Sequence, residues 1–300
     1  MPIDIASYRR WEGRARATPF AALAIASTMI RRRMRNRLVR VIIFAFILLA
    51  SGLAALIFYF TLQGEGDPML QQRLQQFGLA NVNVLAVLNR FFDTRVGFWA
   101  FLLAALVGAP VIAEDRRAHA LPLYFSRPIG HIEYVIGKAA CPAFFLALLL
   151  ILPRIAMYGV ELAFSTVDGV AMKQMPTLLR SCADGALGVV LFTSISIGVS
   201  SLTERPTYAA LFLLGVGVLT TGLSHFLSHV LDNPAWLAVS PWACVHRIGL
   251  DLLPVPSMLS DDTKYLEELK VATAWTGFGL WTALSLGTLV ARIRRVEVVT

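Results

Sequence analysis

The sequence predicts an all-α integral membrane protein with six transmembrane helices and both termini in the cytoplasm, N-in and C-in. Of its 300 residues, 57% are hydrophobic and only 15% are charged, whereas soluble domains carry about 25% charged residues. Six apolar segments are long enough to cross about 30 Å of hydrocarbon as helices. Basic residues gather in the segments that this orientation places on the cytoplasmic side.

The six expected spans have lengths of about 18–23 residues, which suits a bilayer. They are Val41–Leu62, Val96–Ala113, Ala139–Val160, Gly185–Leu202, Tyr208–Val230 and Val271–Val290. The fourth span is diluted by five hydroxyl residues, Thr193, Ser194, Ser196, Ser200 and Ser201. We therefore expect this span to pack against other helices rather than face lipid.

Charge sets the orientation. With the N-terminus inside, the inner segments hold 18 of the 27 basic residues but only seven of the 19 acidic ones. The positive-inside rule then favours N-in and C-in, in the inner (plasma) membrane. The net charge of +8 follows from this topology, so we expect a lipid bilayer and no nucleic acid as partner. The first forty residues show no signal-peptide pattern, so the first apolar segment is expected to be a retained span.

The segments flanking the spans have their own patterns. Residues 1–40 form a basic cytoplasmic segment, in which Thr18 caps and Pro19 opens an amphipathic helix that lies in the membrane interface. An ordinary basic segment before a span is the alternative. Residues 41–295 form the six-helix domain, with an inner loop at 114–138 and outer segments at 63–95 and 231–270, and residues 296–300 form a cytoplasmic tail. In the first outer segment, a helix is expected after Asp67-Pro68, with one apolar side made of Leu70, Leu74, Phe77, Leu85, Leu88 and Phe92.

The inner loop between spans two and three carries the most specific pattern. With its flanks it spans Val107 to Lys138, VGAPVIAEDRRAHALPLYFSRPIGHIEYVIGK. It is dense in charge and in turn-forming residues, and it is longer than a helix–helix connection requires. We expect a short helix that protrudes into the cytoplasm.

This pattern resembles the permeases of type-2 ABC exporters. Their second span ends in an acid, a charged stretch and a leucine pair, and a Ser–Pro turn and a Glu-Tyr-apolar-apolar-Gly-Lys string follow. Here the turn is Ser126-Arg127-Pro128-Ile129 and the string is Glu133-Tyr134-Val135-Ile136-Gly137-Lys138. The chain departs from the family pattern at Ala118–Leu121 and at His131. Six spans and an interfacial helix also fit the family.

The resemblance implies a permease subunit that pairs with a second permease chain, identical or not, and docks on an ABC ATPase subunit. The loop would sit in a cleft of that ATPase and transmit its closure to the spans. The residues that it assigns to this contact are Glu114, Arg116, Arg117, Leu121, Pro122, Leu123, Tyr124, Arg127, Pro128, Glu133, Gly137 and Lys138. A basic loop set by topology alone is the alternative.

The chain itself is expected to be no enzyme. Gly130 and Gly137-Lys138 lack the spacing of a phosphate-binding loop, and Ala139 follows the lysine. ATP and Mg²⁺ therefore belong to the partner ATPase, and no cofactor is expected in this chain. A non-transporting membrane anchor, for assembly or motility, is an alternative. A polytopic enzyme would need clustered polar residues, and the spans are nearly free of them.

Two further sets of polar residues stand in the spans. Arg154 in the third span needs a partner, and Asp184 at a similar depth is the expected one, with Arg180 as a competitor for it. His225 and His229 share one face of the fifth span, with Cys244 and His246 nearby in sequence, which makes them candidate metal ligands. One branch of the family is associated with copper-site maturation of nitrous-oxide reductase, so a copper-linked permease is another alternative. Two interfacial histidines without metal are the simpler interpretation.

Overall fold

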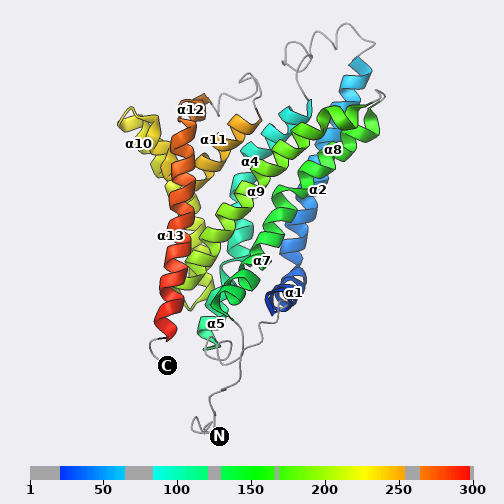
Figure 1. Ribbon diagram of the computed structural model, residues 1–300. Helices are drawn as coiled ribbons and strands as arrows, with labels where there is room; N and C mark the ends of the chain where they lie inside the picture. Colours follow the sequence, from blue (N-terminus) through cyan, green and yellow to red (C-terminus); the bar gives the residue numbers. More distant parts are fainter. Residues whose placement is uncertain (1–20, 65–83, 121–129, 166–168, 254–263, 298–300) are drawn as a thin grey trace, which may run out of the picture.

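The structure, a computed structural model, describes residues 21–64, 84–120, 130–165, 169–253 and 264–297, and every regular element in these ranges is helical. The helices form one elongated bundle (Figure 1). Six segments of the described chain are long and apolar enough to cross a membrane: Arg37–Leu56, Val96–Arg117, His131–Phe164, Val170–Leu202, Pro206–Val230 and Val271–Arg292. The predicted all-α class with six spans is therefore confirmed, and each predicted span overlaps one of these segments. The N-in and C-in orientation stays a prediction.

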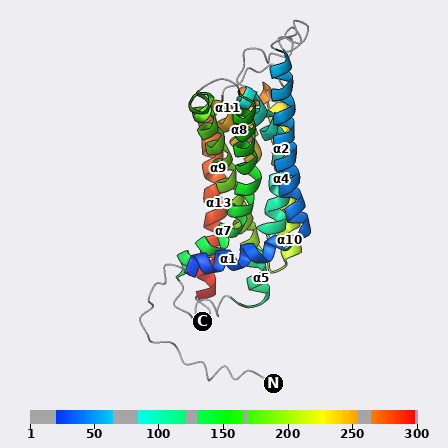
Figure 2. The same ribbon diagram turned by 90° about the vertical axis from the view of Figure 1, so that its right-hand side faces the viewer.

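A short helix precedes the first span. Helix α1 (Ala21–Met34) packs on α7 (His131–Leu150) and lies across the long axis of the bundle (Figure 2). It ends in three arginines, Arg31, Arg32 and Arg33. Thr18, Pro19 and Phe20, from which the helix was predicted to start, lie outside the described residues. Its position in a membrane interface stays a prediction.

The next two helices pack together along one side of the bundle. They are α2 (Arg37–Gly64) and α4 (Val84–Val107). The sequence placed Leu85, Leu88 and Phe92 in an outer segment, but these residues are buried in the core as the first turns of α4. The candidate span itself begins at Val96, as predicted, so α4 extends the second span by three turns that the sequence expected to be helical. Leu70, Leu74 and Phe77 lie outside the described residues.

Two of the spanning segments are broken helices. In the second, α4 ends at Val107 and α5 (Pro110–Arg117) begins after Gly108 and Ala109. In the third, α7 gives way at Ile151 to α8 (Leu152–Phe164). A proline stands at the start of both α5 and α8, where its missing N–H breaks no helical hydrogen bond. The expected span Ala139–Val160 thus covers parts of two helices.

Helix α9 (Val170–Leu202) is the centre of the bundle. Its 33 residues extend about 50 Å, and it contacts α4, α5, α7, α8, α10, α11 and α13. All five of its hydroxyl residues in the predicted fourth span are buried, so the expectation that this helix packs against others is confirmed. Ser194, Ser196 and Ser201 donate to carbonyl oxygens three residues earlier, as serines inside helices often do.

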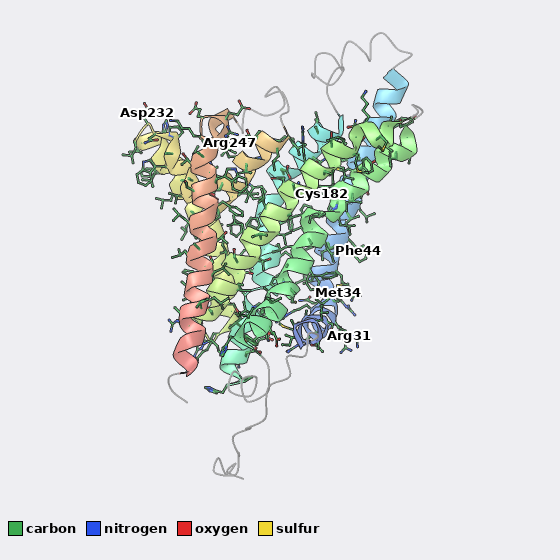
Figure 3. The ribbon with its side chains drawn as sticks, viewed as in Figure 1. Arg31, Met34, Phe44, Cys182, Asp232 and Arg247 are labelled. Atoms are coloured by element: carbon green, nitrogen blue, oxygen red, sulfur yellow. The ribbon has the colours of Figure 1, made fainter. Side chains whose placement is uncertain are left out.

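The last part of the chain returns across the bundle twice. It comprises α10 (Pro206–Val230), the 3₁₀ helix η2 (Pro234–Val239), α11 (Pro241–Leu252), α12 (Lys264–Glu267) and α13 (Val271–Glu297). Asn233 and Ser240 cap η2 and α11. Figure 3 places Asp232 and Arg247 at one end of the bundle, and Arg31 and Met34 at the other. We call these the α11 end and the α1 end.

Candidate functional site

A buried ionic contact closes the base of the loop between α5 and α7. Lys138 Nζ of α7 lies 2.6 Å from Asp115 Oδ2 of α5. Tyr134 donates its hydroxyl to the same carboxylate oxygen at 2.7 Å, and Lys138 also donates to the carbonyl of Val111 at 3.4 Å. Lys138 and Tyr134 are buried. The two helices that carry the loop are therefore fixed to each other where the loop begins and ends.

Helix α5 is also anchored to the central helix by one serine. Ser200 Oγ of α9 accepts from the backbone N–H groups of Ile112 at 2.9 Å and Ala113 at 3.0 Å. The same hydroxyl donates to the carbonyl of Ala109 at 2.6 Å. It thus caps α5 in place of a local side chain, because the first amides of a helix have no partner within it. Sequence reasoning missed this role, since Ser200 is 87 residues or more from the groups that it binds.

Further ion pairs connect α5 to its neighbours at the α1 end. Glu114 lies 2.7 Å from Arg33 and 3.5 Å from Arg32, both on α1. Arg116 pairs with Glu204, between α9 and α10, at 3.3 Å, and it donates to the carbonyl of Ser201. These contacts make α5 the meeting point of α1, α7 and α9 at this end of the bundle.

The remaining residues that the resemblance assigned to ATPase contact lie in different surroundings. Arg117 is exposed. Glu133 accepts from the backbone N–H of Gly130 at 3.3 Å at the start of α7, so it stabilises the end of the helix. Gly137 faces α1: a Cβ built on it would lie 2.9 Å from the carbonyl oxygen of Ala22. The others lie outside the described residues: Leu121, Pro122, Leu123, Tyr124, Arg127 and Pro128.

A second ionic cluster lies inside the bundle. The guanidinium of Arg154, on α8, is 2% exposed and lies 2.7 Å from Asp184 Oδ2 of α9, the partner that the sequence indicated. It also pairs with Asp93 of α4 and donates to the carbonyl of Ser181. Arg180, the expected competitor, is exposed. Arg154 thus joins α4, α8 and α9, and the part played by Asp93 was not predicted.

Two more ionisable residues border this cluster. Arg90, buried one turn before Asp93, interacts electrostatically with Asp93 and Asp184. His246 of α11 is also buried, and burial together with nearby Arg90 holds the pKa of His246 well below its usual range. Of this cluster, only Arg154 and Asp184 lie in or at the edge of the predicted spans, and both were named from the sequence. Asp93, Arg90 and His246 join them from outside those spans, so the full cluster of four helices could not be recognised in the sequence.

The comparison with known families decides the identity of this bundle. The chain matches the family described as ABC-2 family transporter protein over residues 23–288. The chain belongs to the ABC-2 transporter family. No curated protein matches it in a sequence comparison. The resemblance inferred from the loop is therefore confirmed, and the protein is a multi-pass membrane permease of ABC transporters, a family that generally works with an ABC ATPase.

The candidate metal ligands of this ABC-2 permease differ in their exposure. His225 and His229 are exposed on α10, whereas Cys244 and His246 are buried on α11. Within the described ranges, no three His, Cys, Asp or Glu side chains lie close enough together to hold a metal ion. The copper-linked alternative therefore has no support from these residues.

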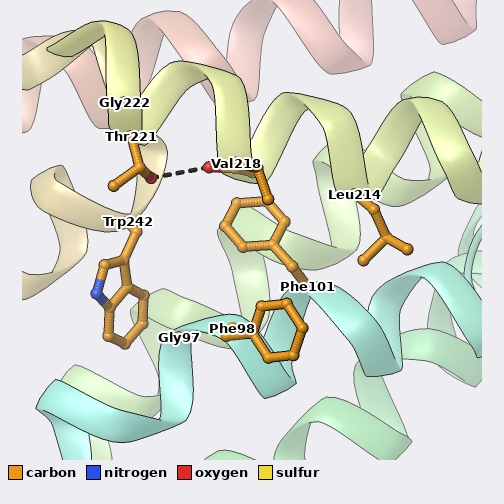
Figure 4. Close-up of a pocket in the computed structure, with 9 residues that line it drawn as sticks. Gly97, Phe98, Phe101, Leu214, Val218, Thr221, Gly222 and Trp242 are labelled. Carbon is orange, nitrogen blue, oxygen red and sulfur yellow. Dashed lines mark hydrogen bonds between the residues drawn. The ribbon is translucent and has the colours of Figure 1, made fainter. Parts of the chain in front are cut away.

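An apolar groove opens between α4 and α10 (Figure 4). Its volume is about 310 Å³, and its lining residues are Gly97, Phe98, Phe101, Leu214, Gly217, Val218, Thr221, Gly222 and Trp242. Phe98 and Val218 at its mouth are exposed. Thr221, its one hydroxyl residue, donates to the carbonyl of Gly217 at 2.8 Å, so the wall presents little polarity. This volume is at the lower end of the range for ligand pockets, about 300–1,000 Å³.

The contact between α1 and α7 gives a first prediction. Replacing Gly137 with valine should push α1 away from α7, because even a Cβ there would meet the Ala22 carbonyl and the Ile25 side chain at 3.2 Å or less. We expect the free energy of unfolding to fall by about 1–3 kcal/mol, as in other overpacked contacts. Thermal unfolding in detergent measures this change. Gly159→Val is the matched control, since Gly159 has open space at its Cβ position, and equal losses in both variants would contradict the prediction.

Proposed function

We propose that this permease is the membrane subunit of an ATP-driven exporter and that the α1 end is its ATPase-docking face. The observation that carries the proposal is the closed base of the loop between α5 and α7, held by Asp115, Lys138 and Tyr134. A loop that transmits force needs fixed ends, because a flexible base would absorb the displacement. Here α5, which carries one end of the loop, is bonded directly to α7 and is bonded to α9 through the hydroxyl of Ser200.

The ion pairs of α5 support the same assignment. Through Glu114 and Arg116, a displacement of α5 would reach α1 and the connection between α9 and α10. Both of those elements adjoin membrane-spanning helices. Closure of the ATPase on the loop would therefore tilt several spans together, and the groove between α4 and α10 would change shape as they move. Hydrolysis, ATP and Mg²⁺ belong to the partner ATPase in this proposal.

The remaining features of the assembly follow from surface composition. Large apolar side chains of α10 are exposed, among them Leu211, Leu219 and Phe226. In a bilayer such a face suits lipid or a second permease chain, and a dimer of permeases would place two loops opposite two ATPase subunits. The basic α1 end would face the cytoplasm of an inner membrane, as the positive-inside rule favours.

Co-purification with the ABC ATPase encoded beside the chain tests this proposal. We expect the native permease to retain the ATPase and to alter its hydrolysis rate. Replacing Leu121, Leu123 and Tyr124 together with alanine should release or uncouple the ATPase, because apolar anchors are removed from the loop. The control replaces Phe226, Val230 and Leu231, exposed apolar residues toward the α11 end, and should leave the ATPase bound.

Two outcomes would contradict the proposal. If no ATPase binds the native chain, or if the loop variant binds and couples like the native chain, the loop has no docking role. If the ATPase binds but its hydrolysis responds to no small substrate, the chain is a membrane anchor rather than a transporter.

A further inference from the structure

One aromatic side chain separates the apolar groove from a small polar cavity. Trp242 lines both spaces. The polar cavity has a volume of about 10 Å³, and its polar lining residues are Asp93, Arg154, Asp184 and His246. A volume of about 10–15 Å³ holds a single water-sized group. A guest of this cavity can therefore be only a small polar group, and a ligand that also fills the groove must pass the indole.

Three of the residues that line the polar cavity carry a buried polar atom without a hydrogen-bond partner among the described residues. These atoms are Arg154 Nε, a donor, Asp184 Oδ1, an acceptor, and His246 Nε2. All three side chains are at least nine-tenths buried. An unsatisfied buried polar atom costs about 1–3 kcal/mol, so a polar guest that pairs with these atoms would be stabilised. A guest here must accept from the guanidinium and donate to the carboxylate.

The groups around the cavity favour an uncharged guest. Asp93 and Asp184 pair with Arg154, and Arg90 lies near both acids, so a guest meets groups of both signs. A carboxylate head would be repelled by the two acids, and an ammonium head could not accept from Arg154. A hydroxyl group both donates and accepts, is uncharged and has the size of water.

Trp242 is placed to divide the two spaces without blocking either. A Cβ on Gly97 would lie 2.5 Å from the indole, so the glycine lets the ring lie against α4. The ring stacks on Phe192 at a centroid distance of 6.1 Å and lies 5.6 Å from His246. In Figure 4 the indole lies at one end of the set of lining residues. The apolar and polar parts of a ligand would therefore meet at this ring.

We propose that the polar cavity binds the hydroxyl group of an uncharged amphiphile whose hydrocarbon chain lies in the groove beside Trp242. This inference rests on the proposed function in one respect only, that such an amphiphile would be the transported substrate. Binding itself needs no ATPase and is tested on the permease alone.

Quenching of tryptophan fluorescence by brominated ligands tests the proposal in nanodiscs of one phospholipid. The probes are a straight-chain primary alcohol, an alkane, a carboxylic acid and a primary amine of equal chain length, each brominated near the head group. The signal of Trp242 is the difference between the native chain and Trp242→Phe. We expect the alcohol to reach half-quenching at a concentration about tenfold below that of the alkane, the ratio expected for one added net hydrogen bond.

Three variants test whether that signal comes from the groove and the polar cavity. Val218→Phe fills the groove mouth and should weaken quenching by every probe, whereas Leu219→Phe, at an adjacent exposed position outside the groove, should not. Gly249→Ala places a Cβ 2.5 Å from Asp184 Oδ1 and displaces this acceptor. It should abolish the advantage of the alcohol while the alkane quenches as before.

Equal quenching by alcohol and alkane, stronger quenching by the acid or amine, or an undiminished alcohol advantage in Gly249→Ala would overturn the inference. If that happens while the loop variant still releases the ATPase, the proposed function stands and only the ligand assignment falls. If the alcohol is preferred but no ATPase binds the native chain, the binding site stands and the transport function falls.

Discussion

Replacing Arg154 with methionine is expected to lower the free energy of unfolding by about 3–5 kcal/mol, the usual cost of removing one partner of a buried ion pair. The substitution leaves the carboxylates of Asp93 and Asp184 buried without the guanidinium that joins them. Because these three residues come from α4, α8 and α9, the loss should loosen the centre of the bundle. Equilibrium unfolding in mixed micelles measures the change.

Two further variants make this test specific. Combining Arg154→Met with Asp93→Asn removes one charge of each sign and leaves Asp184 beside Arg90. We expect part of the stability to return, since the cost arises from an uncompensated buried charge. Arg180→Ala, an exposed arginine on α9, should change stability by less than about 0.5 kcal/mol. A loss below about 1 kcal/mol in Arg154→Met would show that the cluster contributes little to stability.

Replacing Lys138 with methionine is expected to abolish the effect of the permease on its ATPase. Asp115 would lose its ion pair at the loop base and keep the hydroxyl of Tyr134, and an uncompensated carboxylate would move toward water. The ends of the loop would then separate, so that closure of the ATPase displaces the loop without moving α7. The hydrolysis rate of the reconstituted complex, with and without the permease variant, measures the coupling.

The matched controls separate charge from geometry. The double variant Asp115→Asn with Lys138→Met carries no charge at the base, and we expect it to recover part of the coupling. Lys173→Met removes an exposed lysine near the start of α9 and should behave like the native chain. Full coupling in Lys138→Met would show that the loop base is not needed for transmission.

The loop shows how far sequence reasoning reaches in this protein. Glu133, Gly137 and Lys138 were singled out by local pattern, and the structure places Lys138 at the loop base and Gly137 against α1. Asp115, which completes the base, was not singled out, and Tyr134 was named only as part of the string before the third span. Which side chains of α5 and α7 contact each other depends on which of them face inward. A single sequence reveals the inward face only of regular helices with a periodic apolar pattern.

Contacts between segments that are distant in the sequence were harder still to predict. The pairing of Arg154 with Asp184 could be expected because both stand at a similar depth in successive spans. The pairing of Arg154 with Asp93 could not be expected, since Asp93 precedes the second predicted span and was assigned to an outer segment. Ser200 was recognised only as a sign of helix packing, whereas its hydroxyl caps α5.

The sequence by itself determined the helical class, the six spans and the family, because spanning a bilayer demands long apolar runs and backbone hydrogen bonds satisfied within each helix. Only the tertiary structure decided where the helices break, which charges meet inside the bundle and how Trp242 divides a groove from a polar cavity. Those features depend on side chains from three or four helices converging at one depth. Hydropathy is a property of each segment alone and carries no information about its neighbours.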